Sequence, residues 1–243
     1  MTEFSILNLA KTLLFGFKLR LRLKLRLITM PKHFVSNKDE SPPLFHNKFL
    51  DLFSRVHWSV PLFVFVPVVL ACMYWGMVDY KLGWMLLPWF VGGVLFWSFA
   101  EYVLHRFVFH YEPPGKLGEQ IHFIVHGVHH DYPNDSLRLV MPPVLGIPLA
   151  ILFYYLFTYF LGVENTMPFF AGFISGYLVY DMTHYALHHA NIKHPYWKKL
   201  KEHHMVHHYH DPENGYGVSS DFWDKIFRTE FKLVKKGKQV IGD

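Results

Sequence analysis

Cysteine is almost absent from this 243-residue chain, and charge is sparse. Cys72 is the single cysteine, and 18% of the residues are charged. One cysteine excludes a disulfide framework and a thiolate zinc site. A mean hydropathy of +0.14 excludes a disordered chain. The apolar residues are also gathered into long uncharged runs, which argues against an ordinary soluble domain. Any metal chemistry would therefore use the 18 histidines.

Four uncharged stretches approach the length of a membrane span, which needs about 20 apolar residues. They are residues 58–78, 82–100, 139–163 and 165–180. The last reaches this length if it continues through Asp181 to about residue 187. The connections near Asp79 and Glu164 are short enough to permit only tight hairpins. Helices satisfy their own backbone hydrogen bonds in lipid. We therefore predict an all-α integral membrane protein with four transmembrane helices in two hairpins.

The charges predict an orientation. Of the 24 Lys and Arg residues, only Lys81 lies on the far side of this topology. By the positive-inside rule, both termini and the central connection face the cytoplasm, where they form a histidine-rich helical cap. The pI near 9.1 then reflects topology, and we expect no nucleic-acid partner.

The N-terminal segment allows three interpretations. We divide the chain into a basic cytoplasmic segment, residues 1–55, and a membrane domain, residues 56–243. Residues 18–27 alternate basic and apolar side chains. The first interpretation is a membrane-surface segment attracted to anionic lipid. The second is a disordered tail. The third is that translation starts at Met30, so that residues 1–29 are not native.

Ten histidines form four groups on the predicted cytoplasmic side. They are His105, His110, His126, His129, His130, His184, His188, His204, His207 and His208. Residues spaced i, i+3 and i+4 share one face of a helix, which suits every group except the first. His105 and His110 are five apart and need a bulge or a helix end to converge. Ten ligands are too many for one ion, so we predict two ions with about five histidines each. Imidazole suits iron, zinc, copper and nickel. A histidine-rich metal-transport protein is the non-enzymatic alternative.

Further polar residues lie beside these groups. A ligating histidine normally donates its other ring nitrogen to a carboxylate or a carbonyl. Asp181 precedes His184 by three residues inside an apolar span, and a carboxylate there is a functional candidate. Tyr177 and Tyr180 are catalytic candidates, or else members of the interfacial aromatic belt. Glu101, four residues before His105, is a second candidate partner.

These motifs resemble a known superfamily. Residues 105–110 form an HX4H box, and residues 126–130 and 204–208 form HX2HH boxes. Over residues 56–229 the chain resembles the fatty acid hydroxylase/sterol desaturase superfamily of membrane di-metal oxygenases. The strings HGVHHDYPNDSLRLVMPP, YDMTHYALHH and GYGVSSDFWDKIFRT are similar to the fatty acid 2-hydroxylases that act on sphingolipid acyl chains.

The resemblance implies O2-dependent hydroxylation at C2 of an acyl chain, namely that of ceramide or dihydroceramide. It implies that the ten histidines hold two irons in the active form, with zinc able to replace them in isolated protein. Eukaryotic relatives carry an N-terminal cytochrome b5 domain, but no HPGG-like segment precedes the spans here. We therefore expect a separate cytochrome b5-like or ferredoxin-like electron donor. We also expect a bacterial cytoplasmic membrane, or the endoplasmic reticulum if the source is eukaryotic. A sterol or carotenoid hydroxylase or desaturase is the alternative enzyme.

Overall fold

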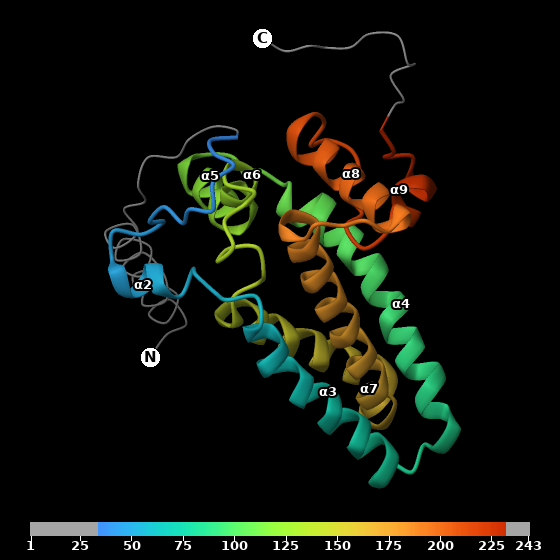
Figure 1. Ribbon diagram of the computed structural model, residues 1–243. Coiled ribbons are helices and arrows are strands. Elements are labelled where there is room, and N and C mark those ends of the chain that lie inside the picture. The colour runs from blue at the N-terminus through green and yellow to red at the C-terminus, as the bar shows by residue number, and fades with distance from the viewer. Residues whose placement is uncertain (1–33, 232–243) are drawn as a thin grey trace, which may run out of the picture.

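The computed structural model describes residues 34–231, and the regular structure of this part is helical, as predicted (Figure 1). The basic segment at residues 18–27 and the alternative start at Met30 lie outside the described residues. Three helices are long and apolar enough to cross a membrane: Val60–Val78, Gly83–Phe109 and Pro143–His189. The first is α3, and the third is α7. The second comprises the 3-10 turn η1 (Gly83–Met85), α4 (Leu86–Leu104) and the π-helical turn η2 (His105–Phe109).

Helix α7 is interrupted at Gly162, where φ is 74° and ψ is 158°. This backbone conformation is accessible essentially only to glycine. The two arms, residues 143–161 and 163–189, fold back on each other. Their rings pack in antiparallel register, with centroid distances of 4.9 Å for both Phe157–Phe169 and Phe153–Phe173. The chain therefore reverses at Gly162 and not at Glu164, which is helical. Crossing of the bilayer by each arm separately, which the four-span topology requires, stays a prediction.

The third apolar stretch also begins later than the sequence suggested. Residues 139–142 are not helical, and α7 starts at Pro143. Pro142 has an extended backbone, as expected for a residue that precedes a proline. Pro143 then occupies the first helical turn, where its missing N–H costs no hydrogen bond.

Glycines bring α4 and the second arm of α7 into backbone contact. A Cβ placed on Gly93 would lie 1.9 Å from the carbonyl oxygen of Phe169. A Cβ on Gly172 would lie equally close to the carbonyl oxygen of Phe90. Small residues permit this close approach between membrane helices, whose association depends on packing because lipid offers no hydrophobic drive.

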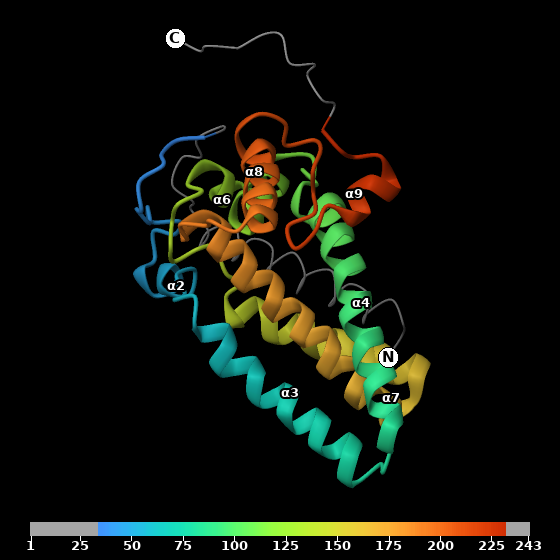
Figure 2. The ribbon, with the colours of Figure 1, turned by 45° about the vertical axis from the view of Figure 1, so that its right-hand side comes forward.

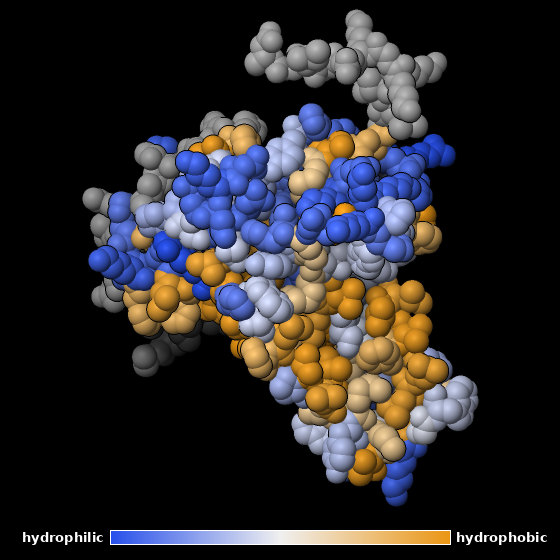
Figure 3. Space-filling view, in the orientation of Figure 1, coloured by the Kyte–Doolittle hydropathy of each residue, from blue (hydrophilic) through white to orange (hydrophobic). Residues whose placement is uncertain are grey.

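The remaining helices form a polar cap at one end of the apolar helices. They are α2 (Lys48–Leu52), α5 (Lys116–His122), the π-helical turn η3 (Phe123–Gly127), α6 (Val128–Asp131), α8 (Pro195–Tyr209) and α9 (Phe222–Phe227). Figure 1 places α5, α6, α8 and α9 around the upper ends of α4 and α7, and Figure 2 shows α6, α8 and α9 there from a second direction. Figure 3 shows hydrophilic residues over this cap and hydrophobic residues over the helices below it. This division is that of an integral membrane protein.

The glycine contact predicts a contrast between neighbouring substitutions. Gly93→Ala should destabilise the fold by about 1–3 kcal/mol, the usual cost of overpacking, because its methyl group meets a backbone carbonyl. Gly92→Ala is the control, since its nearest neighbour is a ring carbon of Phe169 at an ordinary 3.6 Å. The buried thiol of Cys72 reports unfolding through its reaction with a fluorogenic maleimide during heating in detergent. Equal midpoints for the two variants would refute the backbone contact.

Candidate metal centre

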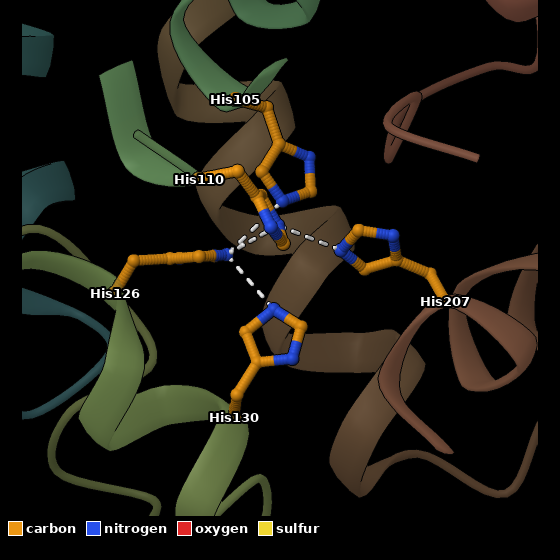
Figure 4. A group of neighbouring side chains, drawn as sticks. All are labelled: His105, His110, His126, His130 and His207. Atoms are coloured by element: carbon orange, nitrogen blue, oxygen red, sulfur yellow. Dashed lines mark hydrogen bonds between the residues drawn. The ribbon is translucent and has the colours of Figure 1, made fainter. Parts of the chain in front are cut away.

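Five histidines converge at the cap end of α4 and form the first cluster (Figure 4). They are His105, His110, His126, His130 and His207. Their Nε2 atoms point toward a common centre. The Nε2 of His126 lies 3.2, 3.1 and 3.0 Å from those of His105, His110 and His130. The Nε2 atoms of His110 and His207 are 3.0 Å apart.

A second cluster forms at the end of α7. Its members are His129, His184, His188, His204 and His208, all of them buried. The Nε2 atoms of His184 and His129 are 2.9 Å apart. That of His204 lies 2.9 Å from His188 and 3.1 Å from His208. The first cluster differs in being less enclosed, because two of its members are only partly buried.

Both clusters have the spacing of a coordination shell. An imidazole nitrogen binds zinc at about 2.0–2.1 Å, so two nitrogens at right angles around one ion lie about 3.0 Å apart. The closest Nε2 pairs match this separation. Within each cluster, one ligand atom from every residue lies within 4.8 Å of all the others. Each cluster therefore fits a single transition-metal ion.

The two HX2HH boxes divide their histidines between the clusters. In the first box, His126 and His130 join the first cluster and His129 joins the second. In the other box, His207 joins the first cluster while His204 and His208 join the second. The spacing predicted that each box would present its imidazoles together. The structure brings all ten histidines together but makes each box contribute to both clusters.

The pair five residues apart converges through a local change of helix type. The backbone N–H of His110 donates to the carbonyl of His105 over 3.2 Å. This i→i+5 hydrogen bond belongs to the π-helical turn η2, which follows α4. π-helical turns inside α-helices are frequent at functional sites. The turn and the helix end at His110 supply the irregularity that the sequence spacing required.

Burial favours the neutral form of the clustered histidines of the cap. The pKa values of His126, His129 and His204 lie well below the usual value. Burial is the largest cause of this lowering, and neighbouring imidazoles lower these pKa values further. For His207, burial lowers the pKa to about 4, although a hydrogen bond to the Asn214 carbonyl opposes the shift. Neutral imidazole is the form that binds metal, so the fold holds these side chains ready to bind an ion.

Two backbone carbonyls orient the first cluster. The Nδ1 of His105 lies 2.5 Å from the carbonyl oxygen of Tyr216, and the Nδ1 of His207 lies 2.8 Å from that of Asn214. A carbonyl only accepts, so each Nδ1 carries the proton and each Nε2 directs its lone pair toward the cluster centre. The 214–219 loop therefore fixes both the orientation and the tautomer of two histidines.

Two buried carboxylates hold this loop. The Oε1 atom of Glu101 accepts hydrogen bonds from the backbone N–H groups of both Val218 and Ser219, at 2.9 and 2.7 Å. The two oxygens of Asp224 accept from Tyr216 at 2.9 Å and from Gly217 at 2.8 Å. Glu101 thus supports His105 through the loop and not by the direct contact that the sequence suggested. Asp224 was not among the predicted site residues, although it lies within the GYGVSSDFWDKIF string.

The candidates beneath the second cluster take different positions. The Tyr180 ring stacks on His184, with centroids 5.8 Å apart and a 25° interplanar angle. Asp181 is buried one helical turn before His184, and its Oδ2 lies 3.4 Å from the backbone nitrogen of Met141. The Tyr177 ring packs between the apolar helices, 5.4 Å from the ring centroids of Phe65 and Trp97.

Comparison with known proteins agrees with this site. The family model described as fatty acid hydroxylase matches residues 89–229, more than half of the chain. This range contains both clusters. The chain belongs to the fatty acid hydroxylase family.

Similar members of the fatty acid hydroxylase family come from several eukaryotes. The dihydroceramide fatty acyl 2-hydroxylase FAH1 of Arabidopsis thaliana is 38% identical over 78% of this chain and 80% of its own length. The ceramide very long chain fatty acid hydroxylase SCS7 of Saccharomyces cerevisiae is 38% identical over 83% of this chain and 52% of its own. The fatty acid 2-hydroxylase of Mus musculus is 39% identical over 76% of this chain and 56% of its own length. The chain thus spans about half the length of the yeast and mouse proteins.

A solved structure of full-length scs7p, in which only the hydroxylase domain is visible, has the same fold. It matches with a TM-score of 0.74 and 38% identity, over 79% of this chain and 73% of the other.

The lowered histidine pKa values predict the pH dependence of metal binding. We expect two ions per chain at neutral pH, retained through the ordinary histidine titration near about pH 6.5. Release should come only as the pH approaches about 4, the pKa of His207. In the metal-free protein, the unfolded chain binds protons below about pH 6.5 that the folded clusters exclude. Its stability should therefore fall as the pH decreases below that value.

Elemental analysis after dialysis at stepped pH, paired with thermal unfolding, measures both quantities. One ion per chain at neutral pH, or full release already at the ordinary histidine pKa, would contradict this arrangement.

The loop contacts predict unequal effects for two isosteric amides. Asp224→Asn replaces one of two accepting oxygens with an NH2 group that faces a backbone N–H. We expect the metal affinity to fall by about tenfold, the lower end of the range for outer contacts. Glu101→Gln retains a single oxygen able to accept both of its N–H donors, so its effect should be smaller. Chelator competition on the two purified variants measures the difference, and a larger loss in Glu101→Gln would reverse the assignment.

Proposed function

We propose that this protein is an O2-dependent 2-hydroxylase of the acyl chain of ceramide or dihydroceramide. The observation that carries the proposal is the pair of five-histidine clusters at the cap end of apolar helices. The similar family members support the substrate class, because their names specify fatty acyl 2-hydroxylation of dihydroceramide or hydroxylation of ceramide fatty acids. No sterol or carotenoid chemistry is needed to explain this resemblance.

The position of the clusters favours reaction near the headgroup. His105 directly follows α4, and His184 and His188 lie in the last two turns of α7. A lipid with its headgroup at the boundary between the cap and the apolar helices would bring only its first acyl carbons to this depth. The rest of the chain would remain among apolar side chains. Selectivity for C2 would then come from positioning, and not from the strength of the C–H bond.

The ten imidazoles would hold two metal ions, for which we propose iron, with zinc able to occupy the same donors. When bound, a pair of irons supplies O2 activation: one oxygen atom enters the C–H bond, the other leaves as water, and two electrons and two protons are consumed. A separate cytochrome b5-like or ferredoxin-like donor would deliver the electrons. The loop carbonyls of Asn214 and Tyr216 would keep their histidines in the ligating tautomer.

We assign positioning roles beneath the second cluster to three residues. Tyr180 would fix the ring of His184 by stacking, and Asp181 would anchor the same helical turn against the segment before α7. Tyr177 would form the apolar floor below them. We further propose four membrane crossings with the cap on the cytoplasmic side, in the endoplasmic reticulum or in a bacterial cytoplasmic membrane.

A pair of histidine substitutions tests the function. His129→Ala removes a buried member of the second cluster from the box that also supplies the first, so it should abolish 2-hydroxylation. His189→Ala is the matched control, because this histidine belongs to neither cluster. The measurement is the ratio of 2-hydroxylated to unmodified sphingolipid by mass spectrometry, in cells that contain equal amounts of each variant. Normal product from His129→Ala would show that the ligand set is wrong.

Asp181→Asn tests the positioning role. It preserves shape but removes the charge, and we expect a folded protein whose metal affinity is about 10–100-fold weaker. Metal content and product ratio are measured in the same preparations. A variant indistinguishable from the parent in both would make Asp181 purely structural. If the unmodified protein alters a sterol or carotenoid and makes no 2-hydroxy acyl lipid, the proposed substrate is wrong.

A further inference from the structure

Helix α2 presents an apolar face to the outside of the molecule. Phe49 and Leu52 are each 66% exposed, Phe53 is 47% exposed and Leu50 is 38% exposed. Figure 3 shows a hydrophobic patch over the position of α2, at the level where the polar cap meets the apolar helices. Large apolar side chains gathered in this way usually mark an interaction surface.

The opposite side of α2 is fixed to the cap through Asp51. This buried carboxylate accepts from the backbone N–H of Leu44 at 2.6 Å and from the guanidinium of Arg55 at 2.6 Å. Arg138, which also pairs with Asp135 at 3.1 Å, lies 3.6 Å from Asp51. Because the polar side is anchored inward, the apolar side chains have to point outward. Their exposure is therefore imposed by the fold.

The connection after α2 ties it to the start of two apolar helices. The backbone N–H of Val56 donates to the carbonyl of Leu137 over 2.7 Å. This bond joins the segments that lead into α3, which starts at Val60, and into α7. Just before α3, the ring of Trp58 packs against that of Tyr185 in α7, with the ring centroids 5.9 Å apart. Tryptophan and tyrosine concentrate at the membrane–water interface, so α2 lies close to that level.

A cationic pocket adjoins the apolar face. Its volume is about 390 Å³. Its lining includes His46, Lys48, Asp51 and Arg55. Asp51 is neutralised by Arg55 and Arg138, which leaves Lys48 as the charge that a ligand could neutralise. Apolar side chains beside a basic group are the combination by which interfacial helices bind anionic lipid.

We propose that α2 is an interfacial membrane anchor, with its apolar face inserted among lipid chains and Lys48 in contact with a headgroup phosphate. A lipid surface fits better than a protein partner, because the patch lies level with the apolar helices and has the basic rim that anionic headgroups attract. The anchor fixes the height of the cap above the bilayer. It does not depend on the proposed hydroxylase activity.

The experiment measures depth with a nitroxide on the full chain in liposomes of phosphatidylcholine and phosphatidylglycerol. In a Cys72→Ala background, the label is placed at Leu52→Cys or, as control, at Lys198→Cys on α8, where the lysine side chain is 65% exposed. We expect the label at position 52 to collide more with O2, which concentrates in lipid, than with a water-soluble nickel chelate. The label at position 198 should show the reverse preference. Metal content verifies that both variants are folded.

Equal accessibility to the nickel chelate at both positions would overturn the insertion. Dipolar broadening between labels at position 52 would show instead that a second copy of the chain covers this face. Lys48→Gln tests the headgroup contact. The label at position 52 should lie deeper in liposomes that contain phosphatidylglycerol than in liposomes of phosphatidylcholine alone when Lys48 is present, but not in the Lys48→Gln variant. An identical deepening in both would overturn the assigned role of Lys48.

Discussion

The structure depends on one requirement: ten imidazoles, eight of them buried, must stay neutral and aimed at two centres. Burial favours the neutral ring, and the carbonyls of Asn214 and Tyr216 place the ring protons of two of these histidines on the far side from the first cluster. Those carbonyls are in turn held by Glu101 and Asp224, two buried carboxylates that contact loop N–H groups and not the clusters. The first cluster is thus oriented by backbone carbonyls of one loop, and the two carboxylates that hold this loop contact its N–H groups.

The division of each HX2HH box makes the two clusters interdependent. A box is a short helical segment, and a shift of that segment moves ligands of both clusters together. The first box supplies two ligands to the first cluster and one, His129, to the second. The second box supplies two ligands to the second cluster and one, His207, to the first. Two ions held in this way would keep a fixed relation to each other. The two clusters lie at the ends of α4 and α7, whose backbones meet at Gly93 and Gly172.

Much of this arrangement could be predicted from the sequence, for physical reasons. Long uncharged runs predicted the apolar helices, and helical spacing predicted that the ten histidines would gather. Spacing could not divide them between clusters, because that depends on which neighbouring helix supplies the other ligands. The chain reverses at Gly162, which adopts a φ/ψ combination that only glycine adopts readily. The reversal was predicted near Glu164, two residues later, because this charged residue interrupts the apolar run. Asp224 was missed because its partners are backbone N–H groups, which have no signature in the sequence.

We propose that the paired histidine clusters hold the metal ions with which one atom of O2 is inserted at C2 of a sphingolipid acyl chain. The most direct measurement supplies 18O2 to membranes that contain this protein, a reductant and ceramide, and locates the label by fragmentation mass spectrometry. We expect one 18O atom in a hydroxyl group at C2 of the acyl chain, and no such product when the metals are removed by chelation. Label at another carbon, an unlabelled 2-hydroxy product or undiminished product after complete metal removal would contradict it.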